Sequence, residues 1–493
     1  MFGICYLRFV ILHLEIVDFG FGFPGCESSR LANWPCIFRN PKSAFRNRVL
    51  MLLFLYNLFL PFALLFSIPF YLRRMLKRGG YARNFVQRFG FFSSALREQI
   101  AGRTWTWIRA VSVGEMLLAL RLAAELRRQN PEFQAVISTT TSTGYQLGLG
   151  RADTAYLRII YSPVDFYPIL QRVWRFIRPT RIVLIDSDLW PSFLALAEHT
   201  RVPVFLANAR LSSRSESRYS RLRWFATHLF WKRLTAVFAQ DPKDADRWKR
   251  LGLPLEKITM TGSIKYDRAG MTTKRDLRFV EWLEQHGITS DRPILLGGSL
   301  HSGEEELLTQ AFLQLRQKHP ALFLILVPRH AERAREIEDL LREKSLAFNR
   351  RSNPLFLPHT AVLLVDSTGE LRDWYETATV VVIGKSFRGV GGQNPVEPLL
   401  AHKPVVCGPH MENFRFLVEE LAAENGIKQL ASEQDLLPAL DQLLADPGAA
   451  NRMVKRAKTV LAQHDGANAR TAQLILNWKP TRPPQISRKD AKT

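Results

Sequence analysis

From about residue 104 to its end, the chain alternates short apolar runs with amphipathic segments, and this alternation limits the fold more than any other feature. The runs that predict strands are 105–111, 135–139, 181–185, 202–207, 236–239, 258–261, 294–297, 322–328, 361–365, 380–383 and 405–407. Helical periodicity marks the segments 116–130, 167–177, 191–199, 242–251, 433–445, 450–463 and 467–477. Such alternation is typical of parallel sheets covered on both faces. Two series, divided near residues 268–290, predict an α/β protein with two Rossmann-like domains facing a cleft.

Residues 49–72 contain no charged side chain. Because about 20 apolar residues span a hydrocarbon core, the run predicts a membrane anchor, although Pro61, Pro69 and Asn57 also allow an interfacial or re-entrant segment. The basic residues that follow are Arg73, Arg74, Lys77, Arg78, Arg83 and Arg88. They favour a cytoplasmic position for the rest of the chain, next to anionic headgroups. A cleaved signal peptide is the alternative, but the run lies far from Met1 and lacks a small-residue cleavage site.

The remaining boundaries follow from composition. Residues 1–48 mix short apolar patches with three cysteines and show no sustained period, so we expect a poorly defined N-terminal extension. Met51 would make a natural start, which leaves two interpretations of the extension: a translated upstream region or a poorly ordered segment. The expected domains are 73–270 and 271–478, followed by a loose Pro- and Lys-rich tail at 479–493.

Charge and cysteine content restrict the partners and the compartment. The 68 Lys and Arg exceed the 45 Asp and Glu, and the net charge of +23 predicts an anionic partner: nucleic acid, an acidic membrane or a phosphorylated substrate. Nucleic acid is least favoured, because no recognition motif occurs and basic residues gather beside the apolar run. Cys5, Cys26, Cys36 and Cys407 show no CxxC spacing, so neither a disulfide scaffold nor a zinc site is indicated, and a reducing compartment fits best.

In the first series, charged residues follow three strands. Glu115 ends the segment AVSVGE and opens a helix at a strand's carboxyl end, where ligands of open parallel sheets bind. It is either a general base or a complement to the helix dipole. Asp186 and Asp188 follow the predicted strand 181–185 in the sequence DSD. This spacing indicates a metal–diphosphate site or, more simply, an N-cap by Asp188 for the helix starting near Pro191. Lys265 in TGSIKYD would balance charge on a leaving phosphate, or is a solvated surface lysine.

In the second series, Arg329 ends a strand in the segment VPRH. Residues 389–397, GVGGQNPVE, form a glycine-rich loop that leads into a helix, whose backbone N–H groups would hold a phosphate while Glu397 binds a ribose diol. The loop is not a dinucleotide fingerprint, since no G-x-G-x-x-G follows the first strand. Together, these strand-end residues predict a nucleotide-dependent enzyme.

Nine short motifs occur in one order over about 300 residues, a highly specific pattern. They are AVSVGE (110–115), LWP (189–191), NARLSSRS (208–215), TGSIKYD (261–267), GEEE (303–306), LILVPRH (324–330), GEL (369–371), NPVEP (394–398) and GPHMENF (408–414). On these motifs the chain resembles the Kdo transferases, the 3-deoxy-D-manno-octulosonic acid transferases of lipopolysaccharide assembly. The resemblance runs from about residue 50 to Leu476.

The resemblance implies a membrane-associated, inverting glycosyltransferase of GT-B architecture. It would move Kdo from CMP-Kdo onto the tetraacylated glucosamine disaccharide bisphosphate precursor of lipid A, at the cytoplasmic face of the inner membrane. The family's base corresponds to Glu115, and its transition-state stabilisers to Asp186 and Lys265. An exposed carboxylate would be ionised at neutral pH, as a base must be. The CMP contacts, on the second domain, correspond to Pro328, Arg329, Gly369, Glu370, Leu371, Asn394, Pro395, Val396 and Glu397. The first domain would bind the acceptor.

CMP-Kdo is a donor substrate, so the resemblance implies no cofactor and no metal. The sequence departs from the family in three places: Asp186-Ser187-Asp188 replaces Glu-Thr-Glu, Gln393 replaces a His, and Arg109 stands where a His is common. The first change shortens each carboxylate by one methylene, and the second alters a donor-side contact. A second basic cluster suits a bisphosphorylated acceptor, or is general surface charge: Arg210, Arg214, Arg218, Arg221 and Arg223.

Two other functions remain open on the sequence alone. One is a different GT-B nucleotide-sugar glycosyltransferase or epimerase, which would bind a uridine diphosphate sugar rather than CMP. The other is a catalytically impaired, membrane-anchored binding protein, in which the Glu-to-Asp changes would be the first sign of lost activity.

Overall fold

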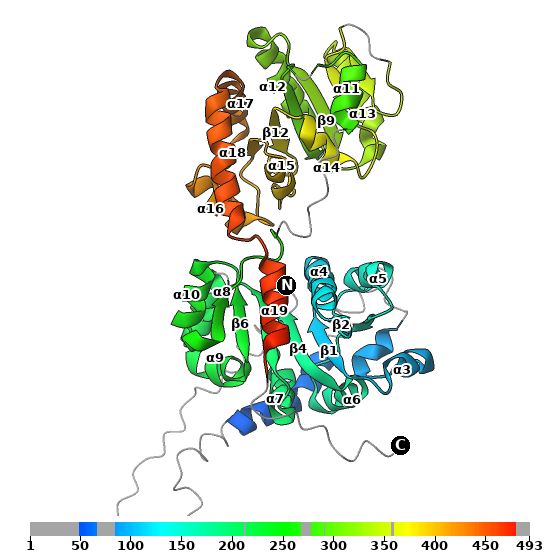
Figure 1. Cartoon of the computed structure of the whole chain (residues 1–493), viewed down its shortest axis with the longest axis vertical. Coiled ribbons are helices and arrows are strands. Elements are labelled where there is room, and N and C mark those ends of the chain that lie inside the picture. The colour runs from blue at the N-terminus through cyan, green and yellow to red at the C-terminus, as the bar shows by residue number, and fades with distance from the viewer. Residues whose placement is uncertain are drawn as a thin grey trace, which may run out of the picture. The chain divides into compact units, whose positions relative to one another are not determined.

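The computed structural model describes residues 49–66, 84–211, 213–267, 278–289, 291–355 and 359–479, apart from the side chains of Ser213 and Arg214. The expected extension at 1–48, the end of the apolar run at 67–72, the basic residues from Arg73 to Arg83 and the tail from residue 480 lie outside the described residues. The chain divides into two compact units, Met1–Asp267 with Gly466–Thr493, and Arg268–Asp465, each built on its own sheet (Figure 1).

The sheet of the first unit has seven parallel strands in the order β3-β2-β1-β4-β5-β6-β7. The strands are β1 (Trp105–Arg109), β2 (Ala135–Thr139), β3 (Leu157–Tyr161), β4 (Pro179–Ile185), β5 (Val204–Ala209), β6 (Ala236–Ala239) and β7 (Ile258–Met260). The sequence missed β3, because Arg158 interrupts its apolar run. An edge strand tolerates this charge, and the Arg158 guanidinium lies over the ring of Trp105, 5.8 Å from its centroid.

Helices cover both faces of this sheet (Figure 1). One face packs against α3 (Ser94–Ile100), α6 (Tyr167–Ile177), α7 (Pro191–Thr200), α9 (Arg223–Leu229) and α10 (Pro242–Arg250). The other packs against α4 (Val113–Gln129), α5 (Ser142–Arg151) and α19 (Ala467–Asn477). The shorter elements are η2 (Phe85–Phe89), α8 (Ser213–Arg221), η3 (Trp231–Arg233) and η4 (Leu255–Lys257). Proline in the first turn of α6, α7 and α10 starts these helices without the loss of a backbone bond.

The last helix belongs to the first unit, whereas the sequence assigned residues up to 478 to the second domain. Asp267 accepts hydrogen bonds from the backbone N–H groups of Gly466 and Asn468, at 2.9 and 2.6 Å. Ala472 and Ile475 of α19 are buried in the core that α4 also covers. The chain therefore returns to the first sheet because an amphipathic helix finds both a cap and an apolar partner there.

The second unit has its own sheet of seven parallel strands, in the order β10-β11-β9-β8-β12-β13-β14. These are β8 (Ile294–Leu300), β9 (Phe323–Pro328), β10 (Phe348–Arg350), β11 (Val362–Leu364), β12 (Val380–Ile383), β13 (Val405–Cys407) and β14 (Lys428–Gln429). Its α-helices are α11 (Arg278–Gln285), α12 (Glu304–Lys318), α13 (Ala334–Glu343), α14 (Leu371–Trp374), α15 (Val396–Leu400), α16 (Arg415–Ala423), α17 (Leu436–Ala445) and α18 (Pro447–Ala462). The 3₁₀ helices are η6 (Ala331–Arg333), η7 (Tyr375–Thr377) and η8 (Glu433–Asp435). The short edge strands β10 and β14 were not predicted, because they consist mostly of polar and charged residues.

The apolar run forms a helix, Val49–Phe66, that lies against α6 and α7 of the first unit (Figure 1). Within the described part of the chain it is the one helix long and apolar enough to cross a membrane. The two polar side chains in this stretch, Tyr56 and Asn57, both bond to the domain. The expected anchor is thus a helix whose two polar side chains both bond to the first unit.

Candidate active site

Glu115 lies in the first turn of α4, beyond the carboxyl end of β1. Ser112 caps this helix: its Oγ accepts a hydrogen bond from the Glu115 N–H at 3.3 Å and donates to the Glu115 Oε1 at 3.1 Å. The backbone N–H of Val111 donates to Oε2 at 2.7 Å. The carboxylate therefore complements the helix N-terminus and also occupies the edge where an open sheet binds ligands.

The environment of Glu115 changes its acidity. The side chain is only partly exposed, and burial raises its pKa to about 8, helped by the negative charges of Asp186 and Asp188. The hydrogen bonds from Val111 and Ser112 act in the opposite direction. The sequence expectation of an exposed carboxylate, ionised at neutral pH, was therefore wrong: in this unit Glu115 takes up a proton near pH 8.

Asp186 follows β4 directly, with a φ of 61° in the left-handed region, which an Asp side chain tolerates better than most. The Nδ2 of Asn208 donates to its Oδ1 at 2.7 Å. Burial raises the pKa of Asp186, while Asn208 and the positive charges of Arg210 and Lys265 oppose that shift. The carboxylate thus lies within electrostatic reach of both Glu115 and Lys265.

Lys265 is half-buried, so the interpretation as a solvated surface lysine was wrong. Burial and the neighbouring Arg210 lower its pKa to about 8, and Asp186 partly offsets the shift. The segment 261–266 crosses from the edge strand β7 back toward β5, which explains why a residue that follows β7 meets one that follows β4. Three residues predicted from separate motifs, Glu115, Asp186 and Lys265, are brought together at one edge of the sheet.

Asn208 joins the loops that carry Asp186 and Lys265, and no role was predicted for it from the sequence. Its Oδ1 accepts hydrogen bonds from the Ile264 N–H at 3.0 Å and the Ser263 Oγ at 3.3 Å, while its Nδ2 binds Asp186. Asn208 is 2% exposed and has a φ of 56°. Its position at the head of the NARLSSRS motif, where a strand ends, was the signal that could have identified it.

Asp188 has a different role from the one expected. Its Oδ2 accepts a hydrogen bond from the Arg109 Nε at 2.8 Å, and its Oδ1 accepts one from the Trp190 indole. The guanidinium of Arg109 also lies over the ring of Phe193. The pair is almost fully buried. The predicted N-cap was therefore wrong for Asp188.

The carboxylate that caps α7 is Asp165. It accepts hydrogen bonds from the backbone N–H groups of Ser192 and Phe193, at 3.0 and 2.9 Å. Asp165 follows β3, the strand that the sequence missed, so its proximity to α7 was not apparent.

Among the described residues, no group of three or more His, Cys, Asp or Glu side chains is arranged to hold a metal ion.

In the second unit, the residues expected to contact CMP lie at or after the carboxyl ends of β9, β11 and β12, with Pro328 as the last residue of β9. Arg329 is exposed directly after β9, and its backbone N–H binds the Leu300 carbonyl at 2.9 Å. Gly369 has a φ of 87° and open space where a Cβ would be. Glu370, which precedes α14, accepts a hydrogen bond from Ser367 and lies 3.5 Å from the Arg351 guanidinium. These loops share one edge of the sheet.

The NPVE segment is internally ordered. The Asn394 Oδ1 accepts from the Val396 N–H, and its Nδ2 donates to Glu397, both at 3.1 Å. Gln393, which replaces the family's His, lies 3.2 Å from the Nε2 of His301. The Gln side chain therefore keeps a polar contact with the loop after β8.

Glu304 also escaped the sequence analysis, although it lies in the GEEE motif. It is 2% exposed, and its carboxylate accepts backbone hydrogen bonds from His301, Lys385, Ser386, Phe387 and Arg388, at 2.6–3.3 Å. It therefore fixes the loop after β8 to the loop after β12. The three acidic residues at a helix start were the available signal.

Comparisons with known proteins identify relatives of this chain. Residues 83–268 match the family described as 3-deoxy-D-manno-octulosonic-acid transferase (kdotransferase). A protein of that name from Haemophilus influenzae is 33% identical over 404 residues, covering 81% of this chain and 92% of the relative. Another from Bordetella pertussis is 30% identical over 424 residues, covering 82% and 94%.

Among solved structures, the UDP-GlcNAc 2-epimerase from Neisseria meningitidis bound to UDP-GlcNAc has a TM-score of 0.50 and 15% identity, covering 76% of this chain and 98% of that chain. At this identity the likeness concerns the fold alone. With the two parallel sheets, it confirms the expected α/β fold of GT-B type with two Rossmann-like domains.

Proposed function

The chain belongs to the 3-deoxy-D-manno-octulosonic acid transferase family, and on that premise we propose that it transfers Kdo from CMP-Kdo to the tetraacylated, bisphosphorylated glucosamine disaccharide precursor of lipid A, with inversion. The observation that carries the proposal is the cluster of Glu115, Asp186 and Lys265 at one edge of the first sheet. An enzyme of this family needs a base, and this edge supplies a carboxyl group with a pKa matched to proton transfer.

In the proposed reaction, Glu115 takes the proton from the primary hydroxyl of the acceptor. The acceptor oxygen forms a bond to the anomeric carbon of Kdo as the bond from that carbon to the phosphate oxygen of CMP breaks. CMP leaves with the bonding electron pair, and the proton remains on Glu115. A pKa near 8 makes the carboxylate a stronger base than an exposed glutamate, while part of it is still ionised near neutral pH.

Asp186 and Lys265 would stabilise the transition state from the same edge. Lys265 is half-buried, so its positive charge acts in a medium of lower dielectric than water and interacts strongly with developing negative charge. Asp186 would stabilise positive charge that develops on the sugar as the bond to CMP lengthens. Asn208 is a positioning residue, since it holds Asp186 and the 263–264 backbone in fixed relation.

The donor would bind the second unit, where the expected contacts cluster after β9, β11 and β12. Arg329, exposed at the end of β9, supplies a cation for the phosphate of CMP. Glu397 lies in the first turn of α15, where it would bind the ribose diol, and Asn394 bonds to Val396 and Glu397 within this segment. The remaining contacts proposed for CMP are Pro328, Gly369, Glu370, Leu371, Pro395 and Val396.

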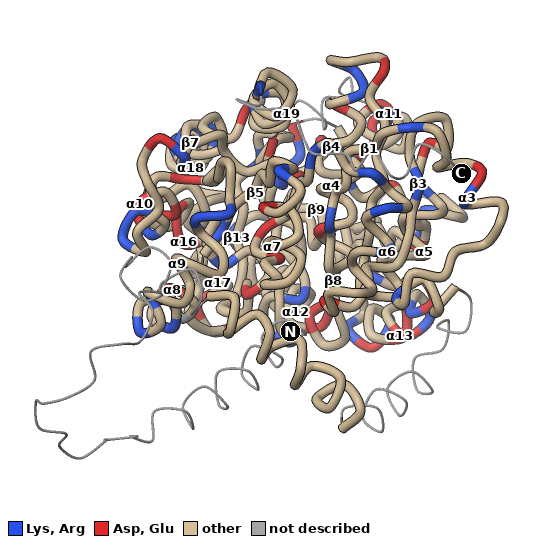
Figure 2. The backbone as a smooth tube through the Cα atoms, turned by 90° about the horizontal axis from the view of Figure 1, so that it is seen from below, with Lys and Arg blue, Asp and Glu red and all other residues tan. Residues whose placement is uncertain are grey.

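The acceptor is anionic, and the first unit has basic side chains where it would approach. Arg210 lies within electrostatic reach of Asp186 and Lys265, and Arg218, Arg221 and Arg223 follow on α8 and α9. Figure 2 shows basic residues on α8. The apolar helix Val49–Phe66 would hold the enzyme at the inner membrane, with both domains on the cytoplasmic face.

The test is a transfer assay with detergent-solubilised full-length protein. CMP-Kdo, generated in place, and UDP-GlcNAc are offered as donors, with the tetraacylated disaccharide carrying two phosphates or none as acceptor. We expect transfer only from CMP-Kdo, stronger to the bisphosphorylated acceptor and unchanged by a metal chelator. Turnover of UDP-GlcNAc in place of CMP-Kdo would contradict the proposal and favour the epimerase-like alternative.

A further inference from the structure

The outward face of the helix Val49–Phe66 consists entirely of apolar residues. Every residue that the structure leaves exposed on this helix is apolar. Seven large side chains are more than half exposed: Leu50, Met51, Phe54, Phe59, Phe62, Leu65 and Phe66. Water does not stabilise such a contiguous aromatic and aliphatic surface, which marks a contact with lipid or protein.

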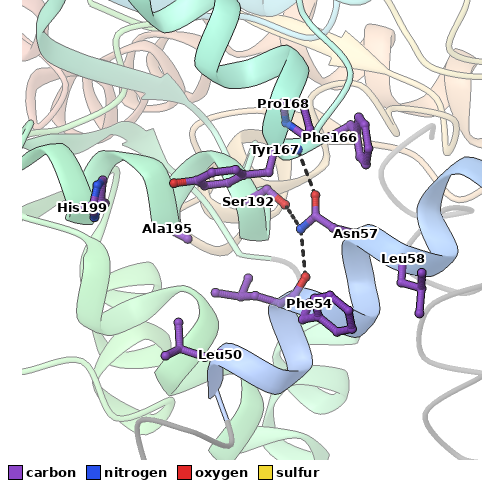
Figure 3. A pocket seen from close by; sticks show the side chains of 11 residues that line it. Leu50, Phe54, Asn57, Leu58, Phe166, Tyr167, Pro168, Ser192, Ala195 and His199 are labelled. Atoms are coloured by element: carbon purple, nitrogen blue, oxygen red, sulfur yellow. Dashed lines mark hydrogen bonds between the residues drawn. The ribbon is translucent and has the colours of Figure 1, made fainter. Parts of the chain in front are cut away.

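The inward face of the same helix is joined to the domain by polar contacts at mid-length. The Tyr56 Oη donates to the Oδ2 of Asp165 at 3.0 Å. The Asn57 Nδ2 donates to the Ser192 Oγ at 3.0 Å, and its Oδ1 accepts from the Tyr167 N–H at 2.8 Å, as Figure 3 shows. Asp165 is a buried carboxyl group, and Tyr56 supplies one of its hydrogen bonds.

These contacts restrict how the helix can meet a bilayer. Its 18 residues span about 27 Å, close to the thickness of a hydrocarbon core. If it crossed the membrane while docked, the Asp165 carboxyl and the start of α7 would lie near the bilayer centre, where a polar domain surface is very costly. A helix that keeps its bonds to Asp165 and Ser192 must instead lie along the membrane surface.

The surroundings of the helix point to lipid rather than protein as the occupant of its outward face. The segment that Arg172 joins to α6 also has exposed apolar side chains, Val86, Phe89 and Phe91. Arg172 donates to the Phe89 carbonyl and covers the Phe91 ring. On the other side, α7 contacts α9, with its exposed Arg223 and Trp224. An apolar face with a basic and aromatic rim matches an anionic lipid interface.

The helix and the domain also leave space between them. A pocket of about 520 Å³ lies between the helix, the start of α6 and the length of α7 from Ser192 to His199. It is lined mostly by apolar side chains, including Leu53, Phe54 and Phe166 (Figure 3). Asn57 and Ser192 are among its few polar neighbours. Within a leaflet, acyl chains would fill this space.

We propose that the helix Val49–Phe66 stays docked on the first domain in the membrane-bound protein and lies in the plane of one leaflet, with its outward face among the acyl chains. The chain would then be attached to one leaflet along this helix rather than threaded through the bilayer by it. This inference concerns attachment only, and it stands independently of the transfer reaction.

The first test measures depth in vesicles of phosphatidylethanolamine and phosphatidylglycerol. Spin labels are placed singly at Met51, Leu58 and Leu65, three exposed positions on one helix face, in the full-length protein. Cys5, Cys26 and Cys36 are replaced by Ser, and Cys407 is kept because it is fully buried. Their depths are read from the relative access of oxygen and a water-soluble nickel complex. A label on exposed Glu132 gives the water-accessible reference.

We expect three similar, shallow depths, about 5–10 Å below the headgroup boundary. Met51 and Leu65 are about 21 Å apart along the helix axis. A profile in which Leu58 is deepest and the two ends approach opposite surfaces would overturn the proposal, and so would full water access at all three positions.

The second test asks whether the helix stays docked. Asn57→Cys with Ser192→Cys joins two side chains that are 3.0 Å apart in the structure. We expect this pair to cross-link on mild oxidation in vesicles, whereas Phe59→Cys with Ser192→Cys, from the outward face, does not. Absence of the first cross-link in vesicles, with its formation in detergent, would show that the helix leaves the domain in the membrane and would overturn the proposal.

Discussion

The side-chain amide of Asn208 donates to Asp186 at 2.7 Å and accepts from the Ile264 N–H at 3.0 Å, so one buried side chain joins two catalytic candidates from separate strands. Asp186 follows β4, and Ile264 precedes Lys265. The relation between these two charges therefore depends on a neutral residue that touches neither donor nor acceptor in the proposed reaction.

The first prediction concerns Asn208. Asn208→Ala leaves the Ile264 N–H and the Asp186 carboxylate without this hydrogen-bond partner. Each buried polar group left unpaired in this way lowers the free energy of unfolding by about 1–3 kcal/mol. We expect a lower melting temperature together with slower Kdo transfer. Asn208→Asp retains the acceptor for Ile264 but places a carboxylate beside Asp186, so it should also transfer slowly. Asn451→Ala, on the exposed face of α18, serves as control. Wild-type transfer by Asn208→Ala would contradict a positioning role.

The second prediction is the pH profile of transfer. The base must be ionised, and the pKa of Glu115 is about 8, so kcat/KM should rise as the pH approaches 8. Lys265 must be charged, and its pKa is also about 8, so the rate should fall above that value. We expect a narrow maximum near pH 8. Lys265→Arg, which keeps its charge at any accessible pH, should extend the alkaline limb. An alkaline limb identical in both proteins would exclude Lys265 as its cause.

The third prediction concerns the stability of the folded protein. The pKa of Glu115 is raised from an ordinary value of 4.5 to about 8, so the folded state binds a proton that the unfolded chain releases. Its favourable contribution is complete below about pH 4.5 and is lost as the pH rises through 8. Glu115→Gln imitates the neutral acid, so its melting temperature relative to wild type should increase between pH 5 and pH 9. Glu132→Gln, on an exposed loop, should show no such trend.

The fourth prediction concerns the buried ion pair of Arg109 and Asp188. Arg109→Leu leaves a buried carboxylate without its charged partner, which typically costs about 3–5 kcal/mol. Arg109→Leu with Asp188→Leu should restore much of that loss, because no unpaired charge remains. Thermal melts of the two single variants and the double variant measure the coupling. Additive losses would show that the pair does not act as a unit.

Much of the fold could be predicted from the sequence, because strand periodicity and turn residues are local signals. Six of the predicted ranges, among them β2, β6 and α19, agree with the structure to the residue. What could not be predicted depends on tertiary contacts. The assignment of α19 to the first unit depends on Asp267, about 200 residues earlier in the chain, and β3 is an edge strand whose Arg158 disguises its pattern.

For the candidate site, too, the local motifs could be predicted from the sequence and the tertiary contacts could not. Glu115, Asp186 and Lys265 were identified by their motifs, and the structure brings them together. The raised pKa of Glu115 could not be predicted, since it results from burial and from two aspartates about 70 residues away. Asn208 and Glu304 were missed because their hydrogen-bond partners lie on other loops. The capping of α7 by Asp165 rather than Asp188 likewise depends on the neighbouring loop after β3.

The most direct test of the account compares wild type with Glu115→Gln in Kdo transfer at pH 8, with CMP binding measured on the same preparations. Gln keeps the size of the side chain but cannot accept the proton. We predict that both proteins bind CMP equally, because the proposed donor contacts lie on the second domain, and that the variant transfers about 10²–10⁴-fold more slowly. Equal transfer by the two proteins would show that Glu115 is not the base.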